Sequence, residues 1–286
     1  MKSISDAQIG DTFYLEGSNI EPFPGYQTPK SVVFAGVYPE DPDQYDELEK
    51  ALQKLCLTDG SVEMGYESSA ALGSGFRCGF LGMLHMDVFR QRLKDEHDMS
   101  VLITQPNVSY LCKLRTKKKI QGDRLSDNLG LAIGVEPGTP DAELERIDNP
   151  AEAPRQEIIV HWKEALTLTS IITPREYLKG IKGLCEDKRG ICMKEEFMSN
   201  GQIIHMEYEI PLSELITDFF DQMKSLSQGY ASLDYEHSRY EISDIRRVTF
   251  FLNGEPVDAL TFLVHEQRLL QFARGYAKKL KEILPP

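Results

Sequence analysis

The stretch ALGSGFRCGFLGMLH at residues 71–85 and the stretch SLSQGYASLDY at residues 225–235 mark the second helix in two copies of one structural pattern. Each copy is expected to contain a strand, a helix that begins at a proline, two strands, a second helix and a last strand. The copies cover about residues 30–114 and 157–240. This is the ferredoxin-like order of elements. We therefore expect an α+β protein with two ferredoxin-like βαββαβ sandwiches in tandem.

The helix signals of the two copies are explicit. Asp41-Pro42 places a capping side chain before a proline at the first helical position, and residues 173–176 (TPRE) add a capping box. Gly190 is expected to end the helix that follows residue 176 in a left-handed conformation. Apolar residues then recur at helical spacing. In the helix expected over about residues 80–97, the residues predicted to face inward are Leu81, Leu84, Val88, Phe89 and Leu93.

The spacing of these signals predicts five segments. Residues 1–28 read as the end of a β-barrel domain and a proline-rich linker, and residues 29–114 as the first ferredoxin-like domain. Residues 115–156, rich in glycine and proline, are expected to be a flexible linker before the second ferredoxin-like domain at 157–241. Residues 242–286 contain too few strands to close a sheet and are expected to begin a truncated α/β domain. Both ends suggest a piece of a longer protein.

Composition limits the classes of function. The 286 residues carry a formal net charge of −13, which opposes free-standing nucleic-acid binding because that activity favours basic surfaces. From residue 246 onward, seven Lys and Arg face four Asp and Glu, a balance of +3. No apolar run approaches the roughly 20 residues needed to span a bilayer. The five scattered cysteines indicate a reducing compartment.

Candidate catalytic and metal sites are not visible in the sequence. His85 lies seven residues from Cys78, a spacing that matches no common metal-binding motif, and the other histidines are scattered. The glycines at 73, 75, 79 and 82 precede a helix, but the segment lacks the sequence motif of a phosphate-binding loop. Tight packing of strand against helix is the favoured explanation, and close approach to an RNA or protein surface is the alternative. No catalytic residue and no metal site are predicted.

Two basic clusters could contact phosphates. Lys117–Lys119 lie in the expected linker, where they serve either solubility or contact with a nucleic-acid backbone. Arg274, Lys278 and Lys281 fall at i, i+4 and i+7, on one face of the last expected helix. Such a row is suited to a polyphosphate, and a plain solvated face explains it equally well.

Several motifs resemble one family. Phe76–His85 is similar to the third domain of LepA-type translation factors, which are ribosome-dependent GTPases also described as back-translocating elongation factors. Thr173–Leu178 and Gly229–Tyr235 are similar to the next ferredoxin-like domain of that family, and Leu252–Leu260 resembles the start of its specific C-terminal domain. Elongation factor G carries a large insertion between the two sandwiches, whereas about 45 residues intervene here. Ile103–Pro106 is more similar to the mitochondrial branch.

The resemblance implies a ribosome-binding C-terminal part of a translational GTPase that promotes accurate protein synthesis by back-translocating tRNAs. Gln228 stands where the family usually has Arg, and Ser74 where it usually has an aromatic residue. The implied contacts with the ribosome or its RNA are Arg77, His85, Lys224, Gln228 and Tyr230, and those with tRNA or rRNA are Arg274, Lys278, Lys279 and Lys281.

The resemblance also implies cofactors, partners and a compartment. GxxxxGK[ST] does not occur in the sequence, so this chain is not expected to be an enzyme. GTP and Mg are expected in an N-terminal domain of the intact protein, which is expected to be a GTP hydrolase. The implied partners are the ribosome (rRNA and ribosomal proteins), tRNA and the protein's own GTPase domain. A monomer in the mitochondrial matrix is expected, with peripheral membrane association left open and the bacterial cytoplasm as the alternative.

Two other functions compete with this hypothesis. A free-standing RNA-binding module built on ferredoxin-like sheets would need exposed aromatic residues on its open sheet faces. A small-molecule-sensing or hydrolytic protein would need convergent polar groups in a pocket.

Overall fold

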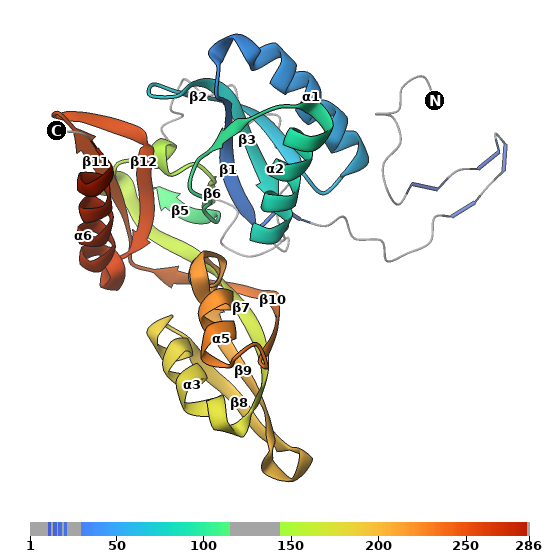
Figure 1. Cartoon of the computed structure of the whole chain (residues 1–286), viewed down its shortest axis with the longest axis vertical. Helices are drawn as coiled ribbons and strands as arrows, with labels where there is room; N and C mark the ends of the chain where they lie inside the picture. The colour runs from blue at the N-terminus through green and yellow to red at the C-terminus, as the bar shows by residue number, and fades with distance from the viewer. Residues whose placement is uncertain are drawn as a thin grey trace. The chain divides into compact units, whose positions relative to one another are not determined.

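The structure is a computed structural model that describes residues 30–114 and 144–284, together with scattered positions between 11 and 21. Its contacts divide the chain into two compact units, and the described part of the first unit ends at Pro106. The mixed α+β class with antiparallel ferredoxin-like sheets is confirmed (Figure 1). Residues 1–10, 22–29 and 115–143, which hold most of the expected segment 1–28 and the Lys117–Lys119 cluster, lie outside the described residues.

The first unit contains one ferredoxin-like module. Its sheet has the order β2-β3-β1-β4, with every pair antiparallel. The core joins the sheet to both helices through residues such as Val37, Leu52, Phe76 and Phe89. The elements are β1 (Val33–Pro39), η2 (Pro42–Gln44), α1 (Tyr45–Thr58), β2 (Glu63–Ser69), β3 (Gly73–Phe80), α2 (Met83–His97) and β4 (Val101–Ile103).

The buried face of α2 differs from the prediction. Phe89 and Leu93 are buried as expected, with Met86 beside them, whereas Leu84 is 78% and Val88 is 49% exposed. Leu81 is exposed as well. The prediction was wrong about these three residues because two neighbouring stripes of α2 both contain apolar residues at helical spacing. In the folded module, Met86, Phe89 and Leu93 are the residues of α2 that pack in the core.

Two glycines of β3 make room for aromatic rings of β1. A Cβ atom added at Gly75 would lie 2.4 Å from Cδ1 of Tyr38, and one added at Gly79 would lie 2.7 Å from Cε1 of Phe34. Both rings are almost completely buried, and they alternate along β1 with residues of the helix-facing core. The glycines therefore serve packing, but against rings on the sheet face away from the helices and not against a helix.

The second unit contains the second ferredoxin-like module and two additional strands. β7 is paired with β10 along one side, and with β5 and then β9 along the other. Figure 1 shows α3 and α5 together on one face of this sheet. The module consists of β7 (Ile159–Pro174), η5 (Arg175–Tyr177), α3 (Leu178–Asp187), β8 (Ile191–Met198), η6 (Ser199–Gly201), β9 (Ile203–Pro211), α4 (Leu212–Glu214), the π-helical turn η7 (Leu215–Phe219), α5 (Phe220–Leu226) and β10 (Ser232–Ser243).

The additional strands correct two predictions. β5 (Tyr110–Leu114) was expected to close the first sheet, but it pairs with β7 and with β6 (Leu144–Ile147) in the second unit. β4 already occupies the place beside β1, so the first sheet has no position for a further strand there. The expected linker is also shorter than 115–156, because β6, η3 (Pro150–Glu152) and η4 (Gln156–Ile158) lie within its last part.

The end of α3 also differs from the expectation in its detail. Arg189, not Gly190, adopts the left-handed conformation, with a φ of 59°. Gly190 instead donates its backbone N–H to the carbonyl of Cys185 at 2.7 Å. The helix therefore ends where the sequence predicts, but a charged residue occupies the position that usually favours glycine.

The C-terminal part is a hairpin covered by one helix. β11 (Ile245–Leu252) pairs with β12 (Glu255–His265), and α6 (Glu266–Ile283) packs on both strands (Figure 1). The turn at Asn253-Gly254 has positive φ at both residues, as a tight hairpin turn requires. Four aromatic rings form the contact between the hairpin and the helix, those of Phe250, Phe262, Phe272 and Tyr276.

Candidate functional site

Arg77, the first predicted ribosome contact, is engaged within the first module. It lies on β3 with its side chain 12% exposed, and its Nη1 is 3.5 Å from Oε1 of Glu67 on β2. Glu67 is itself only 7% exposed. In this arrangement the guanidinium balances a buried carboxylate, so most of its surface is not available to a partner.

His85 connects α2 to the end of α1. Its Nδ1 accepts the backbone N–H of Leu81 at 3.1 Å, and its Nε2 lies 2.8 Å from Oδ2 of Asp59. A neutral imidazole with its hydrogen on Nε2 satisfies both contacts. Burial alone would raise the pKa of Asp59, but hydrogen bonds from Ser61 and His85 outweigh it and hold that pKa below its usual range. These contacts connect the start of α2 to the end of α1 and leave the imidazole 18% exposed.

The loop after α5 presents two of the predicted contacts. Gln228 and Gly229 both have positive φ, 51° and 88°, and Gln228 and Tyr230 are exposed. The fully buried Ser227 holds the loop in shape, because its hydroxyl donates to the carbonyl of Met223 at 2.8 Å and accepts the N–H of Ala231 at 3.1 Å. The loop therefore projects from the end of α5, and the hydrogen bonds of Ser227 hold its backbone.

Lys224 supports this loop from inside. Its Nζ donates to the carbonyl of Ala231 at 2.7 Å and to that of Gly229 at 3.3 Å. The ammonium also lies 5.4 Å from the centre of the Phe220 ring. Lys224 thus satisfies carbonyls beyond the end of α5. Its charge lies behind the loop, at the carbonyls of Gly229 and Ala231.

Tyr177 is a neighbour of the loop that the site prediction missed. Its ring stacks on that of Tyr230, with centroids 6.2 Å apart and planes 11° from parallel, while Tyr230 stays 69% exposed. The sequence places Tyr177 directly after the capping box. This position, at the start of a helix, indicates that Tyr177 lies at the same end of the module as the loop. The apolar periodicity, used alone, predicts instead that Tyr177 belongs to the core.

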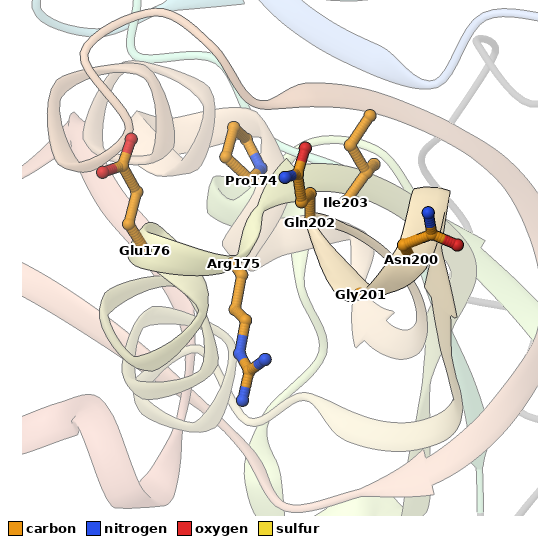
Figure 2. Close-up of a pocket in the computed structure, with 7 residues that line it drawn as sticks. All are labelled: Pro174, Arg175, Glu176, Asn200, Gly201, Gln202 and Ile203. Carbon is orange, nitrogen blue, oxygen red and sulfur yellow. The ribbon is translucent and has the colours of Figure 1, made fainter.

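A shallow pocket of about 470 Å³ lies near the start of η5. Figure 2 shows the Arg175 side chain directed away from the Gln202 amide, while the backbone N–H of Arg175 donates to the carbonyl of Gln202 at 3.0 Å. No Ser, Cys or His is among the described residues that line it. The pocket therefore lacks a nucleophile–base pair of the kind a hydrolytic function needs. Its lining residues are Pro174, Arg175, Glu176, Asn200, Gly201, Gln202 and Ile203.

The open sheet faces do not offer aromatic platforms. In the first module, the rings of Phe34 and Tyr38 on this face are 3% and 2% exposed. In the second, strand alternation places no Phe, Tyr or Trp among the described open-face positions of residues 166–174 and of β8, β9 and β10. Carboxylates predominate on that face, from Glu196, Glu207, Glu209, Asp234 and Glu236. Both observations count against RNA binding through the open sheets.

The cations of α6 are on the surface. Arg274, Lys278, Lys279 and Lys281 are all exposed, and none of them forms an ion pair within the described part of the chain. Helical spacing places Arg274, Lys278 and Lys281 on the side opposite the Phe272 and Tyr276 rings that pack on the hairpin. The same spacing places Lys279 on the side of Phe272 and Tyr276, away from the other three cations. The row predicted from the sequence is therefore available to an anionic partner.

Comparison with known proteins shows what this chain is similar to. The model of the Elongation factor G C-terminus matches residues 162–249. A mitochondrial translation factor GUF1 homolog of Dictyostelium discoideum is 39% identical over 284 residues, which is 99% of this chain and 38% of the relative. Human mitochondrial translation factor GUF1 is 39% identical, with 100% and 40% covered, and elongation factor 4 of Aquifex aeolicus is 39% identical, with 100% and 44% covered.

The chain is homologous over its whole length to the LepA-type translation factors. The resemblance inferred from the motifs is thereby confirmed. The chain spans about two fifths of the length of the LepA-type relatives it matches. The matched elongation factor G segment begins in β7 and ends in β11, so it covers the second module and the loop that carries Tyr230.

Two features are absent from the part of the chain that the structure describes. Within residues 30–114 and 144–284, no group of three or more His, Cys, Asp or Glu is arranged to hold a metal ion. Among the helices that the structure describes, none is both long and apolar enough to cross a membrane.

His265 gives the C-terminal helix a pH dependence. Its Nδ1 accepts the N–H of Gln267 at 3.3 Å and so caps α6. Burial and the nearby Arg189 charge lower its pKa, against smaller opposing effects of Glu164, Asp244 and Glu214. Because the folded protein favours the neutral imidazole, this stabilising effect is complete above about pH 6.5, the unfolded value. It is lost as the pH falls from there through the lower folded pKa.

An NMR titration can check this expectation. The His265 ring should protonate below about pH 6.5, and the Gln267 amide shift should follow the same curve. The variant His265→Asn keeps a capping acceptor that does not titrate, so its Gln267 amide should stay constant over this range. Protonation of His265 at or above the ordinary histidine pKa would contradict the expectation.

Proposed function

We propose that this chain is the ribosome-binding part of a LepA-type translational GTPase that acts in protein synthesis by moving tRNAs backward on the ribosome. The observation that carries the proposal is similarity over the whole chain to proteins named translation factor and elongation factor 4. The fold agrees with this role, since two small α/β modules and a hairpin–helix present surface loops and a cationic helix face.

The catalytic function belongs, in this proposal, to a domain other than those described. The intact protein hydrolyses GTP with Mg²⁺ in an N-terminal GTPase domain, and the chain itself supplies contacts with the ribosome. A phosphate-binding GxxxxGK[ST] does not occur in its sequence, which supports this division of labour.

Two surfaces are the proposed contacts. The first is the loop of Gln228 and Tyr230, with Tyr177 stacked behind it and Lys224 adding positive charge from inside. An exposed tyrosine ring can stack on an unpaired base of rRNA. The second is the cationic face of α6, which is proposed to contact tRNA or rRNA phosphates. Arg77 and His85 are weaker candidates for ribosome contacts, because both already pair with acidic residues inside the first module.

The partners and the compartment are part of the proposal. We place the protein on the ribosome as a monomer, in contact with rRNA, ribosomal proteins and tRNA. The mitochondrial matrix is the proposed compartment, supported by the mitochondrial relatives at 38–39% identity. Bacterial elongation factor 4 proteins at 38–40% identity keep the bacterial cytoplasm as the alternative.

Charge reversal on α6 tests the ribosome contact. The variant Arg274→Glu, Lys278→Glu, Lys281→Glu should co-sediment with ribosomes less than the unaltered chain does at low salt. Because fewer counterions are released, the slope of log affinity against log salt should also be shallower by ~2–3.

A matched control reverses three exposed lysines of the first module, Lys50, Lys54 and Lys94. This control has the same net charge as the α6 variant and should keep most of the binding if the contact is local to α6. Equal sedimentation and equal salt slopes for the unaltered chain and the α6 variant would refute the proposed contact.

A further inference from the structure

A buried group of charged residues lies where the second module joins the C-terminal hairpin and helix. Arg189, at the end of α3, donates from Nη1 and Nη2 to the two carboxylate oxygens of Glu164 on β7, at 2.7 and 2.9 Å. Its Nε donates to Oε1 of Glu214 on α4 at 3.1 Å. The side chains of Arg189, Glu164 and Glu214 are only 14%, 6% and 13% exposed. Such a fork of parallel hydrogen bonds fixes direction as well as distance.

The group continues into the C-terminal part. Nε of Arg268, in the first turns of α6, lies 3.6 Å from the same Oε1 of Glu214. Nη2 of Arg268 is buried and has no hydrogen-bond partner among the residues that the structure describes. The Glu214 carboxylate is therefore the charge that offsets the burial of this guanidinium. Arg189 and Arg268 are linked through one shared oxygen.

The covalent connection at this place is short. β10 ends at Ser243 and β11 begins at Ile245, so Asp244 alone separates the two strands. The hydroxyl of Ser243 donates to Oε1 of Glu164 at 2.7 Å, and the carbonyl of Asp244 accepts the N–H of Glu266 at 2.9 Å. The charged group is thus joined, through Ser243, to the short connection between β10 and β11.

The backbone of Arg189 supports a specific role for its side chain. A left-handed conformation favours glycine and costs any other residue free energy, yet Arg occupies this position and Gly follows it. A plain helix stop has no need of the arginine. The retained side chain is explained by the three hydrogen bonds that it makes from this position.

From these contacts we propose that Arg189 and Glu214 form an ionic joint that fixes the orientation of α6 relative to the second module. Arg189 is a positioning residue in this joint, since it acts on α6 through Glu214 and Arg268. The joint determines the direction in which the cationic face of α6 points. The proposal concerns the orientation of the helix and holds whatever partner that face binds.

Hydrogen exchange on the full chain, read by mass spectrometry, tests the joint. Arg268→Met cuts the link to α6 and leaves the Arg189–Glu164 pair intact. In this variant, amides of α6 and β12 should exchange about tenfold faster while those of β9 keep their protection. Arg189→Gly removes the side chain and relieves the left-handed backbone, and it should also release α6. If Arg189 were only a helix stop, this substitution would leave α6 protection equal or higher.

A control variant separates the joint from ordinary surface charge. Arg239→Met removes a half-exposed arginine that pairs with Glu209 and Glu241 in the same module, and it should leave α6 protection unchanged. If Arg189→Gly loosens the whole second module, loss of protection in β9 reveals this, and Arg268→Met then decides. Unchanged α6 exchange in Arg268→Met would overturn the proposal, and so would the same acceleration in Arg239→Met.

Discussion

Gly75→Ala should strongly destabilise the first module. The new Cβ would lie 2.4 Å from Cδ1 of Tyr38 and 2.8 Å from the carbonyl oxygen of Val37. The Tyr38 ring is 2% exposed and cannot swing into solvent, and the carbonyl belongs to the central strand β1. Overpacking of this kind costs up to about 3 kcal/mol, and a contact with backbone belongs at the upper end.

Gly73→Ala is the matched control for this substitution. It adds the same methyl group to the same strand, at a position with no atom within 4 Å but with a φ of 82°. Its cost should be about 1 kcal/mol, from backbone conformation alone. Urea denaturation followed by the fluorescence of the tyrosines, or by exchange of β1 amides, measures both. Equal stability of the two variants would show that the Tyr38 ring does not depend on the space above Gly75.

Gly190→Ala should have a larger effect than alanine at Gly180, Gly183, Gly201 or Gly229. Its Cβ would lie 2.7 Å from the carbonyl oxygen of Cys185, which already accepts the Gly190 N–H, and 3.1 Å from Cγ1 of the buried Ile210. The end of α3 and the start of β8 would have to separate. We expect a loss of about 2–3 kcal/mol in the free energy of unfolding of this module. Because Arg189 precedes Gly190, release of α6 should accompany it.

Gly183→Ala, seven residues earlier, provides the opposite result in the same helix. No atom lies within 4 Å of its added Cβ, and the position is inside α3. Replacing a helical glycine by alanine at such a place should stabilise the module by about 0.5–1 kcal/mol. Thermal unfolding of both variants gives the comparison. A stabilising Gly190→Ala would contradict the packing described for the end of α3.

Much of the fold follows from local signals. Asp41 caps a helical segment that starts at Pro42, as the sequence predicts. The predicted capping box is wrong, because the segment after β7 starts at Arg175 with Pro174 as its N-cap residue and has no side-chain cap hydrogen bond. The hairpin turns at residues 199–201 and 253–254 lie between the predicted strands. These signals depend on backbone conformation and on hydrogen bonds within a few residues. They need no information from distant parts of the chain. The resemblance to LepA-type factors could likewise be inferred from the sequence motifs alone.

The candidate site was less accessible to such reasoning. The exposed row on α6 was found from helical spacing, since cations on a face opposite aromatic residues stay in solvent. The exposed loop residues Gln228 and Tyr230 came from motif resemblance. The internal use of Arg77, His85 and Lys224 could not be read from the chain, because each of their partners lies on another element or beyond a turn. A charged residue type does not reveal whether its charge is already paired.

The sequence by itself determined the helix and turn positions, the doubled α/β pattern and the LepA-type kinship, because each depends on neighbours along the chain. Only the tertiary structure decided the rotation of α2, the sheet that receives β5 and the role of Arg189. Two stripes of α2 both contain apolar residues, and packing in the core buries Met86, Phe89 and Leu93 while Leu84 and Val88 stay exposed. A strand such as β5 can add to any free edge, and its partner is chosen by which edge is free. Arg189 becomes a joint only because folding brings Glu164 and Glu214 to its guanidinium.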